Sequence, residues 1–541
     1  MNILEYDKDF IYFKGTSHDG YNTGATYVKS KNAWRLPITK SAILDLQTRV
    51  TPPEFNKLSK LLSDLKKYKD EVVSVKDKED TAGDERLRPY QRVDVEFIKK
   101  RKNTAIFNEQ RTGKTPTILL AVEELLGKLI VVCPSGLKIN WKNEYETWLG
   151  KQNGIVVSGT PKNRNDIYKK FKKGDYKALF LSYETLRQDI KKLEGLHHDV
   201  LIVDESHRLR NFKTQQSKAV YRLSKTAQHV YPMTGTPAVN HPSDVYGILR
   251  LLRPSKYTSY WQFIDRYFGY TETRFGRQLL DLKNDKKEEF HELLNSISIQ
   301  RKRKDVMQWV PKVTTRTISL EPDKKQLKQY DTILKEFRYN DNIIPNVIAQ
   351  LTRLRQVCLD PGLLDLDGNS PKTQFILEYL EDNDGKVIVF SSFTSYLKRL
   401  HEKIPNSVLL TGEQTVEEKQ AAVDAIQKGD VKVLLANIIA GGTGWTLDKA
   451  DTIIFSDKSF NPIDNDQAKD RFIPTDPNKE YGAKQIIDLI IENTIEKKVN
   501  QLLLRKYNII KYVNNYGLNA IVSQDEIENN IGDENELLNS K

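Results

Sequence analysis

The chain has 541 residues, enough for about three to four domains of ~100–200 residues each. Hydrophobic residues make up 38% of it and charged residues 29%, a balance that excludes a fibrous or disordered chain. The longest apolar runs are too short to span a membrane, and the polar first residues do not resemble a signal peptide. The net charge of +12 favours a polyanionic partner such as nucleic acid, although a solvated lysine-rich surface explains it equally well.

The two cysteines, Cys133 and Cys358, lie far apart in the sequence and in apolar surroundings. Two cysteines cannot build a disulfide framework or a zinc ligand set. A reducing compartment therefore fits, and we expect a cytoplasmic protein.

Residues 1–68 predict a small α+β accessory domain. Trp34 and Leu36 alternate with polar neighbours, as in a half-buried strand, and helical periodicity begins at Ser41. Residues 69–86 are mostly charged or small, so we interpret them as a linker.

Short apolar strands alternate with helical stretches in residues 87–255 and again in residues 372–520. This alternation predicts two mostly parallel sheets, each covered by helices on both faces, and hence an α/β fold class. Residues 256–371 lose the alternation and predict a helical insertion and interdomain connection, and residues 521–541 form an acidic tail. The expected strands are 104–107, 129–133, 178–181, 200–203, 387–390, 408–410, 431–435 and 452–455.

A Gly-Lys-Thr motif follows the first of these strands and precedes a predicted helix. In that arrangement the backbone amides of Arg111, Thr112 and Gly113 can surround phosphate oxygens at the helix N-terminus. Lys114 would reach the β- and γ-phosphates, and Thr115 would offer its hydroxyl to Mg²⁺. A chance Gly-Lys-Thr triplet is common, so this motif alone leaves the function open.

Two adjacent carboxylates follow another predicted strand of the same domain. Asp204 and Glu205 come directly after residues 200–203, at the carboxyl end of a parallel strand. Asp204 can bind Mg²⁺ through water, and Glu205 can polarise an attacking water. The alternative is a pair of acids in a surface turn, which the preceding phosphate loop disfavours.

Arg88 and Gln91 lie about 20 residues before the phosphate loop, at a predicted helix start after Pro89. A glutamine amide can pair with the donor and acceptor of the adenine edge, which favours ATP. A plain helix start is compatible with the same residues. We therefore predict ATP and Mg²⁺ as cofactors, with Arg88 and Gln91 among the nucleotide-binding residues.

These motifs, with others, resemble the Swi/Snf-type ATPases of helicase superfamily 2. Asp-Glu-Ser-His-Arg-Leu-Arg-Asn resembles the family's acidic box, and Thr-Gly-Thr-Pro resembles its next motif. The matched motifs occur in the family's order between about residues 87 and 505, too many for chance. They are residues 133–135 with Trp141, 182–186, 204–211, 234–237, 354–361, 386–391, 440–445 and 461–471.

The resemblance implies two RecA-like motor domains and a DNA-dependent ATPase that acts on duplex, forked or branched DNA. It places Gly442 and Gly444 in the nucleotide site and gives catalytic roles to Gln467 and Arg471, with Arg471 as an arginine finger from the second domain. DNA contacts of this kind fall mainly on phosphates and weaken with salt. The residues with an implied DNA contact are Ser135, Trp141, Ser182, Asn211, Thr411, Thr443 and Trp445.

Three positions depart from the expected patterns. Asn108 stands where the strict phosphate-loop pattern has its first glycine. Pro474 stands where the sixth motif usually has a second arginine, so Arg471 is the only matched finger. The chemistry can therefore be slow or supported from elsewhere. Trp445 replaces an aliphatic residue and either stacks on a base or sugar or belongs to the core.

The N-terminal residues 1–68 also resemble, more weakly, the HARP domain of annealing helicases, through an aromatic hairpin that ends near Trp34. The alternative is a module that packs on the first motor domain. The short chain and its altered motifs favour a phage or bacterial protein, associated with the nucleoid through DNA and in the host cytoplasm if phage-encoded. No protein partner is predicted, and no membrane partner is expected.

Three functions remain open. The first is a DNA-dependent ATPase that remodels duplex or branched DNA during replication, recombination or repair. The second is the same motor acting to clear proteins from DNA. The third is a non-motor DNA-binding module with a degenerate ATPase, for which Pro474 is the only support. A DNA-stimulated ATPase measurement separates the third from the other two.

Overall fold

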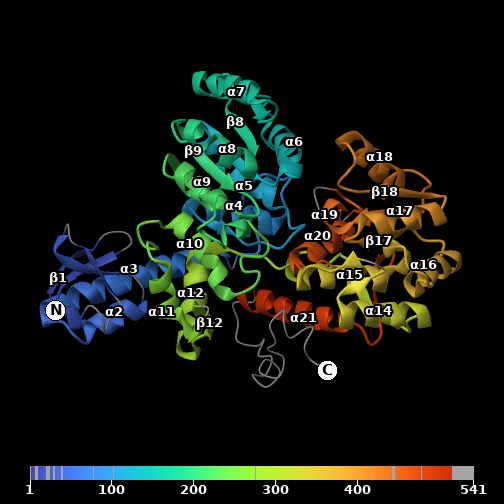
Figure 1. Ribbon diagram of the computed structural model, residues 1–541. Helices are drawn as coiled ribbons and strands as arrows, with labels where there is room; N and C mark the ends of the chain where they lie inside the picture. The colour runs from blue at the N-terminus through green and yellow to red at the C-terminus, as the bar shows by residue number, and fades with distance from the viewer. Residues whose placement is uncertain are drawn as a thin grey trace. The chain divides into compact units, whose positions relative to one another are not determined.

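The fold is described from a computed structural model of the chain (Figure 1). The described residues are 2–6, 10–19, 25–28, 31–37, 40–76, 78–101, 103–273, 276–340, 342–441, 445–474, 476, 478–479 and 481–514. They divide into two compact units, the first up to Val306 and the second from Met307 to Lys511. Each unit contains one large parallel sheet, which confirms the predicted α/β class. The predicted acidic tail, 521–541, lies outside the described residues.

The first unit begins with a four-stranded antiparallel sheet in the order β1-β2-β4-β3, followed by two helices. Eight apolar side chains from strands and helices form a core of its own, from Ile3 to Leu61. Its elements are β1 (Asn2–Tyr6), β2 (Phe10–Lys14), β3 (Thr26–Val28), β4 (Ala33–Pro37), α2 (Lys40–Gln47) and α3 (Pro52–Lys76).

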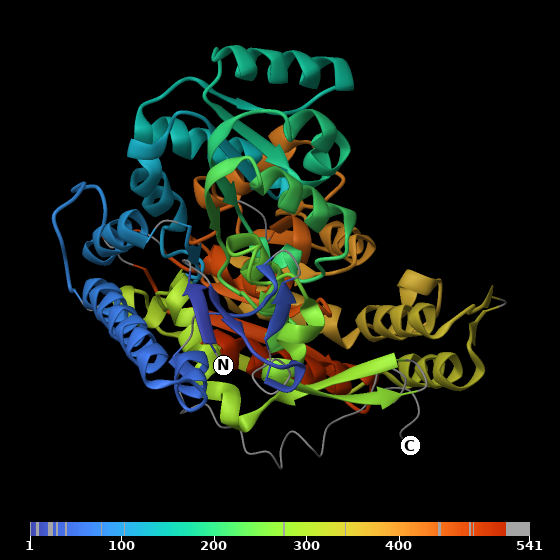
Figure 2. The same cartoon turned by 90° about the vertical axis from the view of Figure 1, so that its left-hand side faces the viewer.

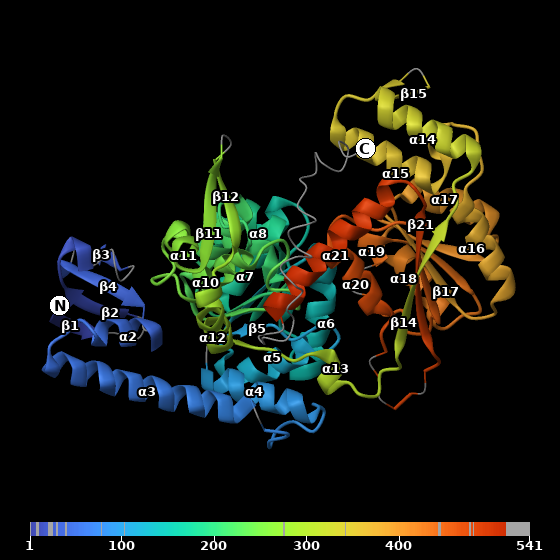
Figure 3. The same cartoon turned by 90° about the horizontal axis from the view of Figure 1, so that it is seen from below.

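Helix α3 continues into the segment that the sequence predicts as a linker, 69–86. It ends at Lys76, and Figure 3 shows it running from the small sheet to α4 (Pro89–Arg101). Val75 is 1% exposed and belongs to the main core of the first unit. The Lys76 ammonium donates to the carbonyls of Asn295 (3.0 Å) and Ser298 (2.8 Å). The end of this helix is therefore part of the unit's packing rather than a linker.

The main sheet of the first unit has the order β10-β9-β6-β8-β7, with every neighbouring pair parallel. The strands are β5 (Ala105–Ile106), β6 (Leu129–Cys133), β7 (Gly154–Val156), β8 (Ala178–Ser182), β9 (His198–Val203) and β10 (Ala227–Pro232). Short β5 extends this sheet through a parallel bridge from Ile106 to Met233. The sequence did not predict β7 and β10, because β7 has three residues and β10 begins with polar and small side chains.

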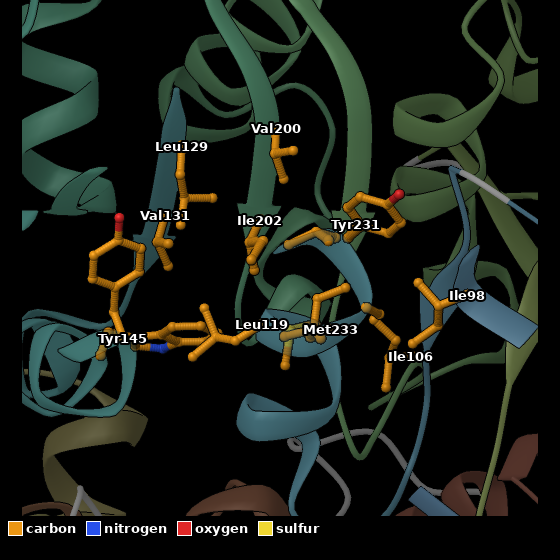
Figure 4. Close-up of a cluster of buried hydrophobic side chains, with 14 of the residues drawn as sticks. Ile98, Ile106, Leu119, Leu129, Val131, Tyr145, Val200, Ile202, Tyr231 and Met233 are labelled. Carbon is orange, nitrogen blue, oxygen red and sulfur yellow. The ribbon is translucent and has the colours of Figure 1, made fainter. Parts of the chain in front are cut away.

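Successive side chains of the main strands pack on opposite faces of the sheet, as the pleat requires. Val131 and Ile202 belong to one apolar cluster, and Val132 and Val203 belong to the other. Figure 4 shows the first cluster, where side chains of β6, β9 and β10 line up against Leu119 of α5. Helices cover both faces, which explains why these strands are continuous apolar runs. The helices are α4, α5 (Lys114–Val122), α6 (Lys138–Leu149), α7 (Pro161–Lys173), α8 (Tyr183–Leu193), α9 (Gln215–Ser224) and α10 (Tyr246–Leu252).

The structure divides residues 256–371, predicted as a helical insertion, between the two units. These residues form strands as well as helices. In the first unit they form a two-stranded ribbon that projects as a long hairpin in Figures 2 and 3. Strand β14 instead joins the second sheet, parallel to β21. Its Thr-rich sequence alternates weakly, as fits an edge strand. The first-unit elements are α11 (Tyr260–Tyr267), β11 (Phe268–Thr273), β12 (Gly276–Leu282), α12 (Lys287–Ile297), β13 (Ser298–Ile299) and α13 (Arg303–Val306).

The second unit has a six-stranded parallel sheet in the order β14-β21-β20-β17-β19-β18. Its strands are β14 (Val313–Leu320), β17 (Val387–Ser391), β18 (Ser407–Leu410), β19 (Val433–Asn437), β20 (Thr452–Phe455) and β21 (Lys484–Ile491). A small hairpin, β15 (Arg338–Tyr339) and β16 (Asn342–Ile343), connects two of its helices.

The helices of the second unit complete both sides of its sheet. They are α14 (Lys324–Glu336), α15 (Val347–Leu359), α16 (Pro371–Asp382), α17 (Thr394–Lys403), α18 (Val416–Gln427), α19 (Ile438–Gly441), α20 (Pro462–Phe472) and α21 (Ile495–Asn514). Among the helices of the described residues, none is both long and apolar enough to cross a bilayer.

Candidate nucleotide site and nucleic-acid contact motifs

The sequence motifs of the first unit converge on one edge of its sheet. Asn108 follows β5, Ser135 follows β6, Ser182 ends β8, Asp204 follows β9 and Thr234 follows β10. In a parallel sheet the carboxyl ends of all strands meet at the same edge, and this edge is where ligands of open α/β sheets bind. The topology therefore brings together motifs that lie more than 100 residues apart.

The phosphate loop is a tight turn that only particular residues can form. Arg111 (φ 68°) and Gly113 (φ 77°) both have left-handed backbone, and α5 begins at Lys114. A side chain at Gly113 would place its Cβ 2.1 Å from the Gln91 amide nitrogen, so both space and backbone require glycine. The Lys114 ammonium donates to the Glu109 carbonyl at 3.2 Å, across the loop.

Gln91 holds this loop in the structure rather than facing outward as an adenine reader. Only 5% of Gln91 is exposed, and its amide nitrogen donates to the carbonyls of Thr112 (3.2 Å) and Gly113 (3.3 Å). The Gln91 side-chain oxygen accepts from the Arg88 amide at 2.9 Å. The Tyr90 hydroxyl adds a hydrogen bond to the Thr112 carbonyl at 2.9 Å. The start of α4 and the phosphate loop are thus one hydrogen-bonded assembly.

Asp204 is a buried carboxylate whose side chain is held by an indole. Burial, and then the neighbouring Glu205 carboxylate, raise the pKa of Asp204 to about 6, while the Trp141 hydrogen bond and the Lys114 charge act in the opposite direction. The Trp141 indole nitrogen donates to Asp204 Oδ2 at 2.9 Å. Trp141 is 1% exposed, so the predicted DNA contact by this residue is wrong. Its ring fills the core beside α6, and it positions Asp204.

Glu205 belongs to the acidic box at this sheet edge and has an uncommon backbone conformation. Its φ of 49° is left-handed, and its amide donates to Asp204 Oδ1 at 2.9 Å. His207 Nδ1 lies 3.2 Å from Glu205 Oε2 and 3.1 Å from Thr234 Oγ1. His207 therefore joins the acidic box to the Thr-Gly-Thr-Pro motif. The sequence did not predict a role for His207, although its place in the Asp-Glu-Ser-His box was a signal for one.

The residues at this edge fit a magnesium-bound triphosphate. Two adjacent carboxylates, one of them buried and near a lysine, favour a cation as a third partner. Lys114 and Thr115 open α5, where backbone amides and the helix dipole favour phosphate oxygens. Mg²⁺ characteristically takes one or two carboxylates plus substrate phosphates. The donor set is therefore suited to Mg²⁺ and ATP.

The predicted DNA-contact residues of the first unit differ in exposure. Ser135 and Asn211 are exposed, Ser135 in a short 3₁₀ turn after β6 and Asn211 just after the acidic box. Ser182 is 4% exposed, and its hydroxyl accepts from the Thr185 amide at 3.1 Å as the N-cap of α8. The Ser182 side chain is therefore a helix cap, and only Ser135 and Asn211 present their side chains to solvent.

In the second unit, Gln467 and Arg471 lie four residues apart on α20, so they share one face of that helix. Both are half-buried, and the Arg471 carbonyl accepts from the Leu447 amide at 2.8 Å. Thr411 is 3% exposed at the end of β18, and Trp445 is half-buried against the sheet core. The predicted site residues Gly442, Thr443 and Gly444 lie outside the described residues.

Pro474 has a structural consequence for the sixth motif. Helix α20 ends at Phe472, and Ile473 already has an extended backbone (φ −74°, ψ 128°). The residue before a proline is disfavoured in the helical region, so Pro474 ends the helix here. The position of a second family arginine therefore lies beyond α20, and only Arg471 stands on the helix.

An arginine from the family marker at 354–361 holds the turn that leads to α20. Arg355 is 8% exposed and donates to Asp457 Oδ2 (2.7 Å) and to the Lys458 carbonyl (2.5 Å). The Ser391 hydroxyl donates to the other Asp457 oxygen at 2.5 Å. The sequence predicts the marker but no role for these residues, since no local pattern brings residues 355 and 457 together.

Two family models match the chain. A model described as an SNF2-related domain matches residues 31–363, and one described as a helicase conserved C-terminal domain matches residues 371–473. Among solved structures, the chain is similar to a Sulfolobus solfataricus SWI2/SNF2 ATPase core in complex with dsDNA, with 23% identity, 84% of this chain, 98% of that chain and a TM-score of 0.38.

Curated relatives come from bacteria and eukaryotes. An uncharacterized ATP-dependent helicase of Mycoplasma genitalium is 26% identical over 79% of this chain and 42% of its own length. Protein CHROMATIN REMODELING 4 of Arabidopsis thaliana is 26% identical over 79% of this chain and 21% of its own length. A chromodomain-helicase-DNA-binding protein 1-like of Danio rerio is 26% identical over 81% of this chain and 45% of its own length. The chain spans less than half the length of these relatives. Because the SNF2-related model alone covers more than half of the chain, the chain belongs to the SNF2-related, Swi/Snf-type family of superfamily 2 helicases.

Proposed function

We propose that the protein is a DNA-dependent ATPase that translocates on DNA and remodels duplex or branched substrates in replication, recombination or repair. The observation that carries the proposal is that the phosphate loop and the Asp204–Glu205 pair lie at the same edge of one sheet. Membership of the SNF2-related family supports it, as does the similarity to a Mycoplasma genitalium relative described as an ATP-dependent helicase.

In the proposed mechanism the first unit binds the nucleotide. Lys114 would contact the β- and γ-phosphates, while Thr115 and Asp204 would hold Mg²⁺, which neutralises phosphate charge when bound. Glu205 would orient the attacking water and accept its proton, with His207 Nδ1 3.2 Å from its carboxylate. Arg471, with Gln467 on the same helix face, would supply positive charge to the transition state from the second unit.

DNA binding is proposed to rest on exposed residues at the ends of strands and on the basic charge of the chain. Ser135 and Asn211 are exposed, and the net charge is +12. Contacts of this kind bind phosphates without regard to sequence, and salt weakens them. DNA would associate the protein with the nucleoid, in the host cytoplasm for a phage-encoded chain.

The test of the proposal is ATP turnover measured with single-stranded, duplex and forked DNA side by side at one salt concentration. Stimulation by duplex or forked DNA is expected. Turnover that no DNA stimulates would contradict the proposed motor, and the absence of turnover under all conditions would favour the degenerate ATPase.

Glu205→Gln should keep nucleotide binding and reduce turnover by ~10²–10⁴, because an amide keeps the shape of the side chain but cannot accept the proton. Fluorescent-nucleotide binding and steady-state hydrolysis measure the two effects separately. Glu124→Gln is a matched control, because it changes an exposed glutamate of the same unit that lies outside the matched motifs. Hydrolysis at the parent rate in Glu205→Gln would show that Glu205 does not orient the water.

The N-terminal sheet is proposed to recognise branched DNA. Tyr27 is 45% exposed and packs edge-on against Trp34 with ring centroids 5.2 Å apart, and Arg35 follows on the same strand as Trp34. Exposed aromatic rings can stack on unpaired bases for ~1–3 kcal/mol each. The core of this sheet, from Ile3 to Leu61, is separate from the core that contains Val75.

Deletion of residues 1–68 should therefore leave a folded, DNA-stimulated ATPase, because Val75 and Lys76 remain in place. It should lower affinity for forked DNA by about ten- to a hundredfold, as expected for ~1–3 kcal/mol, with duplex affinity nearly unchanged. Fork and duplex dissociation constants at one salt concentration measure the ratio. An unchanged ratio would remove structure recognition from this sheet, and an insoluble product would make it a packing module of the motor.

A further inference from the structure

The segment Ser298 to Arg303, here called the clamp segment, runs alongside the strand and loop that bind phosphate. Its strand β13 pairs in parallel with β5, matching Ser298 to Ala105. Beyond the strands, the Phe107 amide donates to the Ile299 carbonyl at 2.8 Å, and the Glu109 amide donates to the Arg301 carbonyl at 2.9 Å. The clamp segment thus follows the chain into the phosphate loop itself.

The contact continues through the Glu109 side chain. The Arg303 amide donates to Glu109 Oε2 at 2.7 Å. The Glu109 carbonyl in turn accepts from Lys114 at 3.2 Å and from the Thr112 hydroxyl at 2.6 Å. One residue of the loop therefore connects the clamp segment to the lysine that would contact phosphate.

A second connection passes through buried side chains. Arg301 Nε donates to Asp94 Oδ1 at 2.8 Å, and Asn108 Nδ2 donates to Asp94 Oδ2 at 2.6 Å. Asp94 is 0% exposed and Asn108 is 1% exposed. Arg301 also donates to the carbonyl of Lys76 at 3.3 Å. Three distant parts of the chain, α3, α4 and the clamp segment, are thus joined through Arg301 and Asp94 to the residue that begins the phosphate loop.

This network is a poor device for stability alone. A fully buried carboxylate is costly, and burial raises the pKa of Asp94 although Arg301 and Asn108 act against that shift. Well-packed apolar residues are often at least as stable as a buried ion pair. Directional hydrogen bonds instead define one position for the Asn108 side chain, and Asn108 occupies the place of a flexible glycine in the strict phosphate-loop pattern.

We infer that Arg301 is a positioning residue whose side chain holds the phosphate loop in its nucleotide-binding shape through Asp94 and Asn108, while the backbone of the clamp segment reaches the same loop through Glu109. The inference rests on the proposed ATP site but not on any action on DNA. Arg301 precedes Val306, the last residue of the first unit before the second begins. The same arginine therefore ties the shape of the loop to the chain that connects the two units.

The test compares variants of the full chain in two measurements that need no turnover. The first is hydrogen–deuterium exchange of residues 107–113 without nucleotide, and the second is binding of fluorescent ADP with Mg²⁺. The variants are Arg301→Ala, Arg301→Lys, Asp94→Asn, Asn108→Asp and a swapped double variant that combines Asp94→Asn with Asn108→Asp. Lys304→Ala is the matched control, since it removes an exposed cation that directly follows the clamp segment.

Arg301→Ala should speed exchange in the phosphate loop and weaken ADP binding by about 10- to 100-fold, the order that a misplacement of about 1 Å can cost. Asp94→Asn leaves the half-buried Arg301 without its carboxylate, and Asn108→Asp places two carboxylates together, so each should also weaken binding. The swapped double variant restores one carboxylate and one amide and should recover most of the lost ADP affinity. Arg301→Lys keeps the charge and should be intermediate, while Lys304→Ala should equal the parent.

Thermal unfolding of each variant separates local from global effects. The inference would be overturned if Arg301→Ala showed the same hydrogen exchange and the same ADP affinity as the parent chain. The inference would also be overturned by a swapped double variant that binds ADP no better than the two single variants. So would hydrogen exchange of the loop that rises only in proportion to lost global stability. If Arg301→Ala does not fold, Arg301→Lys and the swapped double variant decide the question. A parent chain that binds no nucleotide would instead refute the proposed ATP site.

Discussion

Lys114→Ala is expected to reduce ATP turnover below detection while leaving nucleotide-free DNA binding intact. Lys114 opens α5 and supplies the main side-chain cation for the β- and γ-phosphates, so its loss removes charge stabilisation that no neighbour replaces. The variant also loses the 3.2 Å hydrogen bond from the Lys114 ammonium to the Glu109 carbonyl, so the loop becomes less constrained before ATP arrives. The proposed DNA contacts lie on other side chains, so DNA binding should persist.

Steady-state hydrolysis at saturating DNA, with DNA binding measured separately by fluorescence anisotropy, checks both halves of this expectation. Lys162→Ala is a suitable control because it removes an exposed lysine from α7 of the same unit. Near-normal turnover in Lys114→Ala would refute the assignment of residues 108–115 as the phosphate loop. Loss of DNA binding together with turnover would show a folding defect instead.

Arg471→Ala should lower turnover by ~10³–10⁵ if Arg471 is the arginine finger. Pro474 ends α20, so the helix offers no second arginine at the family position to compensate. Arg471→Lys keeps the positive charge but loses the planar, two-pronged donor geometry, so it should recover only part of the rate. Nucleotide binding should change little in either variant, because a finger acts mainly on charge that develops in the transition state.

Turnover at saturating ATP and DNA measures this effect, and fluorescent-nucleotide binding is the accompanying check. A loss under about threefold would be far below the range of an arginine finger and would mean that another arginine performs the role. A large loss of nucleotide affinity with little change in the maximal rate would assign Arg471 to ground-state binding instead.

Local sequence patterns were sufficient to predict both parallel sheets and the ends of several strands. The expected strands at 129–133 and 452–455 have the bounds of β6 and β20. These strands are buried on both faces, so their sequences are continuous apolar runs bounded by polar motif residues. The phosphate loop and the Asp204–Glu205 pair were predictable for a related reason, because each directly follows such a strand and its chemistry depends on adjacent residues.

Other strands carried too little local signal. β7 has three residues, β10 starts with Ala227, Gln228 and His229, and β14 lies at an edge with mostly exposed side chains. Such segments become strands because a neighbouring backbone offers hydrogen bonds. That neighbour is not visible in a local window of sequence.

By itself, the sequence determined the α/β class, the order of the motifs and the residues that would perform ATP chemistry, because these depend on short-range patterns. Only the tertiary structure decided what surrounds those residues. It turned Trp141 from a predicted DNA contact into a buried donor to Asp204, which lies 63 residues away in the sequence. It also brought Arg301 to Asp94 across 207 residues. Contacts of this range depend on the packing of whole elements against one another, which no spacing between neighbouring residues encodes.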